Sequence, residues 1–321
     1  MIAQLKNTSH SFRIFFSVFI VFNIILSSFF LDIWPTWNTT SRTLTVLAVC
    51  HHHTLNIDTF QLRTQDKCFV NGHYYSEKAP LPALITIPFY YLIKSDSDLI
   101  DDENGVIGKP DYLLGGFLCG SLPLVFIVSL IFLNIYKEKS IVSAVFLSML
   151  PIYGSFLFLY SGTFLNHLMG GALLLAAYVF LQDKKNLFAA GIFSGLAFLS
   201  DFPLGIALPV WALQIYLTHK SAKSIWHFVG GFMPSLLFIL AFNYFITGNP
   251  FKMLYQFVSN EEFVHGRETL GFAVIHFDAL WQMLFSMYRG IFIYFPILIF
   301  LFTFLSRVTA RCSRIPSTEV K

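Results

Sequence analysis

The sequence predicts an all-α integral membrane protein that crosses the bilayer about eight times. The chain has 321 residues, of which 55% are hydrophobic and 12% charged, with 38 Phe and a mean hydropathy of +0.65. Several apolar stretches approach or exceed the roughly 20 residues that a helix needs to cross about 30 Å of hydrocarbon. A soluble domain could not bury this much apolar surface. We therefore expect residues 1–321 to form a single multi-pass membrane domain.

The predicted spans are distributed along the whole chain. They are Ile14–Leu31, Tyr112–Tyr136, Ile141–Phe158, Thr163–Leu181, Leu187–Ser200, Leu204–Leu217, Ile225–Ile246 and Leu284–Leu305. Leu187–Ser200 and Leu204–Leu217 have 14 residues each, which is roughly 21 Å of helix, and they are expected to form a hairpin. Its turn at Asp201-Phe202-Pro203 should lie below the outer membrane surface, on the wall of a cavity.

Lysine and arginine residues set the predicted orientation, because they accumulate in short cytoplasmic segments. With the N-terminus inside, 12 of the 21 basic residues are cytoplasmic: Lys6, Arg13, Lys137, Lys139, Lys184, Lys185, Lys220, Lys223, Arg307, Arg311, Arg314 and Lys321. If the apolar segment Ala83–Ile93 crossed the membrane, every later basic cluster would be outside. We therefore expect this 11-residue segment to lie at the surface or to re-enter the membrane, and both termini to be cytoplasmic.

Two long segments, residues 32–111 and 248–283, then form outer loops. Long loops that are neither repetitive nor of low complexity are often binding or catalytic elements, and the first is the candidate catalytic loop. Within it, Ser41–Val49 has the spacing of a short amphipathic helix on the membrane surface. Pro80 and Pro82 favour extended backbone before them. Glu77 and Lys78 are therefore expected on a stiff, non-helical segment near the lipid phosphates.

The first outer loop contains the residue types that phosphoryl-lipid chemistry requires. Arg42 can bind a phosphate through two hydrogen bonds, and Lys78 can supply a point charge. Asp66 and Asp58 are candidates for the general base that takes a proton from an acceptor hydroxyl. The alternative interpretation of these charges is a solvated loop surface.

Other candidates lie near the outer ends of the predicted helices. His167, Asp201 and Tyr75 are expected to line a cavity, because ionisable groups at membrane depth usually face protein or water. Arg289 either contacts the donor phosphate or extends to the lipid headgroups. Glu77 and His265 are candidate ligands for a divalent cation. No basic patch of the kind that binds nucleic acid is present.

A family resemblance rests mainly on the segment Gly72-His73-Tyr74-Tyr75-Ser76-Glu77-Lys78-Ala79-Pro80-Leu81. It resembles the Gly-x-x-Tyr-x-Glu-Lys-Pro-Pro-Leu segment of the polyprenyl-phosphate-dependent glycosyltransferases of the GT-C superfamily, especially family 39 and the lipid A aminoarabinose transferases. Ser41-Arg42, Asp66-Lys67, Phe242-Asn243-Tyr244, Gly248-Asn249-Pro250, Arg289-Gly290 and Pro296 are similar to other landmarks of the family. The resemblance covers most of residues 10–305.

The resemblance implies a GT-C-like fold and a reaction at the outer leaflet of a bacterial inner membrane. A sugar would pass, with inversion, from a polyprenyl phosphate to an acceptor that the sequence does not identify. Lys78 and Arg42 would neutralise the departing lipid phosphate, and Glu77 could help to hold a divalent ion. The lipid bilayer and the polyprenyl-phosphate sugar are the expected partners.

The chain departs from the family pattern in two ways. Thr39 and Thr40 stand where relatives carry an acidic residue before the loop arginine, and a threonine is not a competent base near neutral pH. Relatives also have several more helices, which indicates a shortened copy. An inactive homologue that binds lipid phosphate and a transporter of lipid-linked glycans are therefore the alternatives.

Overall fold

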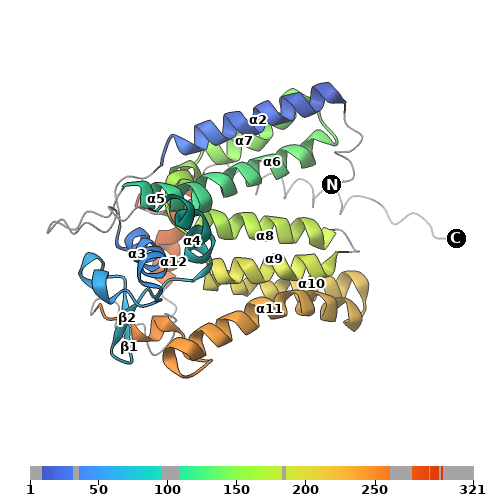
Figure 1. Ribbon diagram of the computed structural model, residues 1–321. Coiled ribbons are helices and arrows are strands. Elements are labelled where there is room, and N and C mark those ends of the chain that lie inside the picture. Colours follow the sequence, from blue (N-terminus) through green and yellow to red (C-terminus); the bar gives the residue numbers. More distant parts are fainter. Residues whose placement is uncertain are drawn as a thin grey trace.

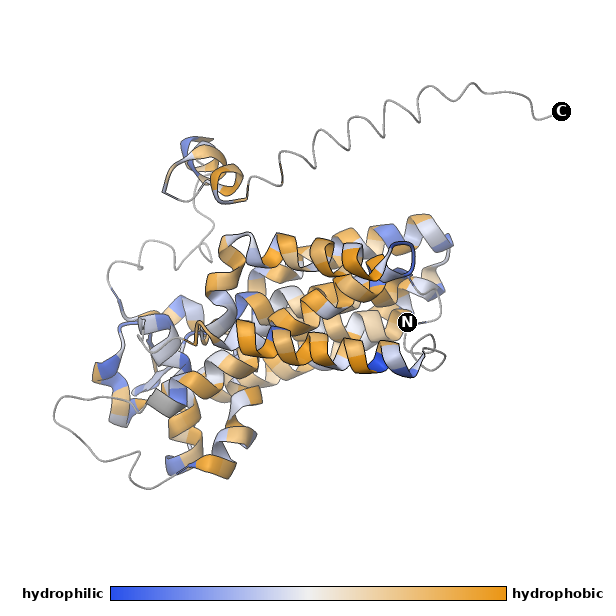
Figure 2. Ribbon diagram, turned by 90° about the horizontal axis from the view of Figure 1, so that it is seen from above, coloured by the Kyte–Doolittle hydropathy of each residue, from blue (hydrophilic) through white to orange (hydrophobic). Residues whose placement is uncertain are grey.

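A computed structural model of the chain describes residues 9–31, 36–94, 109–182, 186–260, 277–288, 290–295 and 298. It is mostly helical, and its long helices lie side by side in a bundle (Figure 1). The bundle helices are α2 (His10–Ser28), α5 (Lys109–Gly116), α6 (Leu122–Tyr136), α7 (Ile141–Tyr153), α8 (His167–Gln182), α9 (Leu187–Ser200), α10 (Ala207–His219) and α11 (Ala222–Thr247). Figure 2 shows that most of their residues are hydrophobic, as expected for helices in contact with lipid.

Four helical segments of the described chain are long and apolar enough to cross a membrane. They are His10–Ser28, Asp111–Tyr136, Phe202–His219 and Ala222–Thr247. Asp111–Tyr136 includes the π-helical turn η3 (Phe117–Ser121), and Phe202–His219 includes the 3-10 turn η5 (Phe202–Ile206). A fifth span is counted if α7 and η4 (Phe156–Gly162) form one broken segment. Within the described residues, the protein is thus a helical membrane protein with four or five helices of spanning length, and part of the last predicted span lies outside these residues.

The predicted span Ile141–Phe158 is not one straight helix, because the chain bends by 80° between α7 and η4. Pro151 lies in the last turn of α7, where it removes one backbone donor. The amide of Gly154 closes the helix on the carbonyl of Leu150, at 2.9 Å. The hydroxyl of Ser155 then accepts a hydrogen bond from the amide of Leu157 and starts η4.

The predicted hairpin around Asp201 is present as α9, η5 and α10, and α9 has the predicted limits. Helix α8 starts later than predicted, at His167 rather than Thr163. The last predicted span, Leu284–Leu305, is interrupted after α12 (Phe277–Phe285), and α13 (Ile291–Tyr294) is a separate turn. The remainder of that span lies outside the described residues.

Glycines bring the backbones of α9 and α11 into direct contact. A Cβ atom on Gly191 would lie 2.0 Å from the carbonyl oxygen of Phe228, and one on Gly231 would lie 2.0 Å from that of Phe188. Small residues at such crossings permit the close helix packing that stabilises membrane bundles. These contacts fix the position of α11, whose far end contributes to the site described below.

Residues 36–94, which belong to the first predicted outer loop, fold against one end of the bundle. They contain α3 (Trp37–His52), η1 (Asp58–Arg63), strands β1 (Cys68–Val70) and β2 (His73–Tyr75), and α4 (Leu81–Ile93). In Figure 1 these elements gather at the left, whereas the connections α6–α7 and α10–α11 lie at the opposite end. The segment after α11, with η6 (Leu254–Phe257), joins the loop through the amide of Ser259, which donates to the carbonyl of Lys67 at 2.9 Å.

The antiparallel hairpin β1–β2 corrects the all-α prediction. Asn71 and Gly72 form its two-residue turn, with φ angles of 52° and 90°. Both angles are positive, as a type I′ turn requires, and Asn-Gly is the preferred sequence for this turn. The side-chain amide of Asn71 donates to the carbonyl of Ile246 in α11, at 3.1 Å, and so anchors the turn to the bundle.

Two helices of this loop differ from their predicted form. Ser41–Val49 lies within α3, but nearly all of its residues are buried, so it is a packed element and not a surface helix with one face in the lipid. It packs against α4. Helix α4 begins at Leu81, two residues before the predicted start, although Glu77 and Lys78 are non-helical as expected. At 13 residues, α4 is apolar but shorter than a span.

Candidate functional site

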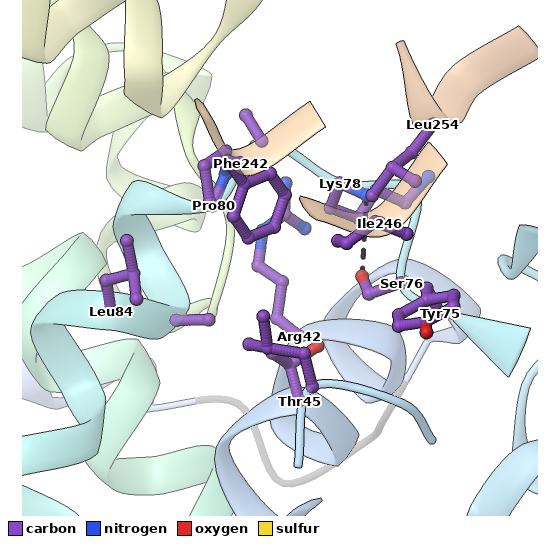
Figure 3. A pocket seen from close by; sticks show the side chains of 13 residues that line it. Arg42, Thr45, Tyr75, Ser76, Lys78, Pro80, Leu84, Phe242, Ile246 and Leu254 are labelled. Carbon is purple, nitrogen blue, oxygen red and sulfur yellow. Dashed lines mark hydrogen bonds between the residues drawn. The ribbon is translucent and has the colours of Figure 1, made fainter. Parts of the chain in front are cut away.

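A recess lies where α3, the segment before α4, α4 itself, α11 and η6 meet. Its lining consists of Arg42, Thr45, Leu55, Tyr75, Ser76, Lys78, Ala79, Pro80, Ala83, Leu84, Phe242, Ile246 and Leu254. Figure 3 shows Arg42 and Lys78 around the same pocket as the apolar side chains of Phe242, Ile246 and Leu254. The recess therefore combines two cations with a predominantly apolar surface.

Lys78 is held between two carboxylates. Its Nζ atom lies 2.7 Å from Oε1 of Glu77 and 3.0 Å from Oδ2 of Asp66. All three side chains are largely removed from solvent, with exposures of 15%, 3% and 11% for Lys78, Glu77 and Asp66. Ion pairs with this little exposure are screened far less by salt than surface pairs. The structure thus brings together three of the predicted site residues.

Hydroxyl groups fix the backbone around this cluster. The Oγ atom of Ser41 donates to the carbonyl of Asp66 at 2.5 Å and lies 2.7 Å from Oγ of Ser76. Ser76 in turn accepts a hydrogen bond from the amide of Lys78, at 3.4 Å (Figure 3). These bonds join α3 to the two segments that carry Asp66 and Lys78, so the charged groups are positioned before any ligand binds.

Arg42 is almost fully buried, with 2% of its surface exposed. Its Nη1 atom donates to the backbone and side-chain oxygens of Asn38, and its Nη2 atom donates to Oδ1 of Asn166 at 2.9 Å. Among the described residues, Nε of Arg42 has no hydrogen-bond partner. Burial lowers the pKa of this guanidinium to about 10, although the negative charges of Asp201, Asp66 and Glu77 raise the pKa and so partly oppose this shift. Arg42 remains a cation at neutral pH and keeps one unsatisfied donor.

The balance of charge in the cluster is close to zero. Arg42 and Lys78 are matched by Asp66 and Glu77, and burial raises the pKa of Glu77 above the ordinary carboxyl range despite the nearby ammonium of Lys78. In the described part of the chain, Oε2 of Glu77 is buried without a hydrogen-bond partner. Protonation of Glu77 would give the cluster a net positive charge and a better site for an anion.

Asp58, predicted as a possible base, has a structural role on the hairpin. Its Oδ1 accepts a hydrogen bond from the amide of Tyr74, and its Oδ2 lies 2.6 Å from Nδ1 of His73. Both distances are short, and the side chains of His73 and Asp58 are partly exposed, at 52% and 38%. Asp58 thus stabilises β2 and does not belong to the cluster around Lys78.

Thr39 and Thr40 also have structural roles at the start of α3. Thr39 and Thr36 form a reciprocal capping box at the start of α3. The hydroxyl of Thr40 lies 3.2 Å from that of Tyr112 in α5. Neither threonine side chain is available as a base, in agreement with the departure noted in the sequence.

The remaining predicted site residues fall in three places. Tyr75 lines the recess, as expected. His167 and Asp201 form a pair, with Nδ1 and Oδ2 3.4 Å apart. Arg289 and His265 lie outside the described residues.

Asn166 is the main site residue that the sequence analysis missed. It is buried, its side-chain oxygen accepts from Arg42, and its backbone oxygen accepts from Ser200 of α9. An asparagine beside His167, at the end of a hydrophobic stretch, was the available signal. Ser41 and Ser76 were also missed, because a serine in a loop has no pattern that distinguishes a bridging hydroxyl from a solvated one.

The donor groups near Lys78 offer little to a metal ion. Within the described ranges, no group of three or more His, Cys, Asp or Glu side chains could hold a metal ion. Glu77 offers one unpaired oxygen, but the ammonium of Lys78 already occupies the position between Glu77 and Asp66. These carboxylates therefore suit a protein cation better than a divalent ion.

Comparisons of the chain with protein-family models, with curated proteins and with solved structures give no match.

Proposed function

We propose that this protein is a glycosyltransferase that takes a sugar from a polyprenyl phosphate at the outer leaflet and transfers it to an acceptor. The observation that carries the proposal is the recess in which buried Arg42 and partly buried Lys78 lie beside an apolar wall. A lipid phosphate has the matching chemistry, because an anionic head is joined to a hydrocarbon chain. The resemblance of residues 72–81 to the GT-C family is the reason for proposing that a sugar passes from the lipid phosphate to an acceptor.

The cations would act mainly on the leaving group. Glycosyl transfer proceeds through an oxocarbenium-like state in which negative charge accumulates on the departing phosphate. Arg42 and Lys78 are already positioned and largely shielded from water, so their charges stabilise this state without reorganisation. Nε of Arg42 is a buried donor without a partner among the described residues, and a phosphate oxygen would satisfy it.

The apolar wall would bind the first isoprene units. Phe242 and Ile246 come from α11, a helix of spanning length, and Leu84 comes from the apolar helix α4. A chain leaving the recess along these residues would continue into the hydrocarbon region. The eight-span topology and the GT-C-like fold belong to this proposal, with the basic connections facing the cytoplasm and the recess facing away from it.

A cysteine-labelling experiment tests that orientation. Leu62 in η1 is 86% exposed, and Lys139 is an exposed residue in the α6–α7 connection. In a Cys312→Ser background, an impermeant maleimide should label Leu62→Cys in intact cells, and Lys139→Cys only after permeabilisation. The reverse pattern would place the recess in the cytoplasm, where an outer-leaflet donor could not reach it.

A divalent cation remains a separate prediction, and no step of the proposed reaction uses one. Glu77 would supply one ligand, with His265 from the second outer loop. Treatment of the purified protein with EDTA measures this directly. Unchanged turnover would support catalysis by Arg42 and Lys78 alone.

The activity itself is tested with decaprenyl-phosphate mannose, glucose and arabinose in proteoliposomes, with a membrane extract as the source of acceptors. Release of decaprenyl phosphate is the readout. Wild type and the control Lys139→Met should turn over one of these donors, whereas the double variant Lys78→Met/Glu77→Gln should not. The double variant is chosen because it removes both charges of the Lys78–Glu77 pair and so leaves only one carboxylate, that of Asp66, without its cation.

A protein that binds decaprenyl phosphate but releases none from any donor would support the alternative of an inactive homologue. The specific observation behind that alternative is the structural use of Thr39, Thr40 and Asp58.

A further inference from the structure

The pair of His167 and Asp201 lies at the end of the bundle that carries the recess. His167 is the first residue of α8, and Asp201 follows the last residue of α9 in extended conformation, with φ −152° and ψ 110°. The hydroxyl of Ser200 donates to the carbonyl of Asn166 at 3.2 Å and fixes these two helix ends together. The 3.4 Å between Nδ1 of His167 and Oδ2 of Asp201 thus follows from the packing of α8 against α9.

Arg42 connects this pair to the recess. The guanidinium lines the recess and donates to Asn166, the residue next to His167. The negative charge of Asp201 also favours the charged form of Arg42, by more than the charges of Asp66 and Glu77 do. A phosphate bound to Arg42 would therefore lie close to the helix ends that carry His167 and Asp201.

The side chain of His167 is more exposed to solvent than the carboxylates near Lys78. The side chain of His167 is 56% exposed, whereas Asp66 and Glu77 are buried in their contacts with Lys78. Their side chains are only 11% and 3% exposed, so an acceptor hydroxyl does not reach their oxygens. Asp58 is engaged by His73 and Tyr74. His167 is thus the accessible base among these groups.

We propose that His167 is the general base of the sugar transfer and that Asp201 positions it. The inference rests on the proposed function and adds the residue that activates the acceptor, a molecule with a nucleophilic hydroxyl. Nδ1 faces the carboxylate of Asp201 at 3.4 Å, so we assign the proton of the neutral ring to Nδ1 and the accepting role to Nε2. The Tyr160 ring is perpendicular to the His167 ring, with the centroids 5.6 Å apart, and limits rotation of the imidazole.

The step balances as a displacement at the anomeric carbon. The acceptor hydroxyl transfers its proton to Nε2 of His167 while its oxygen forms a bond to the anomeric carbon. The bond between that carbon and the phosphate oxygen breaks, and the electron pair leaves with the polyprenyl phosphate beside Arg42 and Lys78. The proton on His167 then passes to water, and the imidazole returns to its neutral form.

The test separates a catalytic role from a structural one. His167→Ala and Asp201→Asn are assayed in proteoliposomes for release of decaprenyl phosphate from the donor that wild type uses, and for binding of [³²P]decaprenyl phosphate. General-base catalysis contributes about 10²- to 10⁴-fold, so kcat of His167→Ala should fall by about that factor. Binding of decaprenyl phosphate should change less than about threefold. Because His167 is half exposed, added imidazole should restore part of the rate of His167→Ala but not of Asp201→Asn.

His227, an exposed histidine in α11 that bonds the backbone of Lys223, provides the matched control, and His227→Ala should behave as wild type. Normal turnover by His167→Ala would overturn the assignment while leaving the glycosyltransferase proposal intact. Loss of turnover together with loss of decaprenyl phosphate binding and no imidazole rescue would also overturn it, in favour of a structural role. A wild type that releases no decaprenyl phosphate would overturn both proposals.

Discussion

Removal of the Lys78 charge is the sharpest perturbation of the buried cluster. Lys78→Met keeps the length of the side chain but deletes the ammonium, which lies 2.7 Å from Glu77 and 3.0 Å from Asp66. Two buried carboxylates would then face each other without a cation between them. Removing one member of a buried ion pair costs about 3–5 kcal/mol. We expect the free energy of unfolding to fall by about this amount at neutral pH.

The measurement is unfolding by SDS titration in mixed micelles, followed by tryptophan fluorescence. The matched control is Lys139→Met, the same substitution at an exposed residue, which should stay within about 0.5 kcal/mol of wild type. The double variant Lys78→Met/Glu77→Gln should recover part of the loss, because it leaves one carboxylate without a cation instead of two. If Lys78→Met proves as stable as Lys139→Met, the cluster is solvated and the account of a preformed cationic site is wrong.

Three further predictions address the anion site and the bundle. Burial raises the pKa of Glu77, and deprotonation of Glu77 adds negative charge near the phosphate. The affinity for decaprenyl phosphate should therefore fall as the pH rises through that pKa, by up to about tenfold per pH unit. A wild-type affinity that does not depend on pH, or an equal pH dependence in Glu77→Gln, would contradict this. The lysine of Arg42→Lys cannot keep the hydrogen bonds to both Asn38 and Asn166, so decaprenyl phosphate should bind about 10- to 100-fold more weakly. An unchanged affinity would exclude Arg42 from the site. Gly191→Ala should destabilise the bundle by about 1–3 kcal/mol, because the new Cβ atom would clash with the carbonyl of Phe228. Gly171→Ala in α8 is the control, since its Cβ atom would meet nothing within 4 Å, and it should be neutral or stabilising. Equal stabilities of the two variants would contradict the α9–α11 packing.

Local chemistry explains which parts of the fold could be predicted from the sequence. The limits of α9 follow from its apolar run between Asn186 and Asp201, and both α4 and α11 lie close to their predicted ranges. The break after α7 was missed because Pro151 and Gly154 were treated as part of a continuous apolar stretch. The hairpin at Asn71-Gly72 carried a readable turn signal, but the strands have three residues each, too few to show alternation.

Local sequence also explains which features of the candidate site could be predicted and which could not. Residue type and sequence proximity predicted that Glu77 and Lys78 would act together, and the structure adds Asp66 to this pair. Burial could not be predicted, because Arg42 lies in a segment that reads as an amphipathic surface helix. The contacts of Asp58 with the hairpin and of Asn166 with Arg42 join residues 15 or more positions apart, and no local pattern encodes such contacts.

Equilibrium binding of [³²P]decaprenyl phosphate to the protein in nanodiscs is the most direct measurement of the central claim, that Arg42 and Lys78 form a site for a lipid phosphate. Wild type and Lys139→Met should bind with equal affinity, and unlabelled decaprenyl phosphate should compete while decaprenol, which lacks the phosphate, should not. Lys78→Met/Glu77→Gln should bind at least about tenfold more weakly, a difference of about 1.4 kcal/mol. Equal affinity of all three proteins, or equal competition by decaprenol, would show that the recess does not recognise the phosphate.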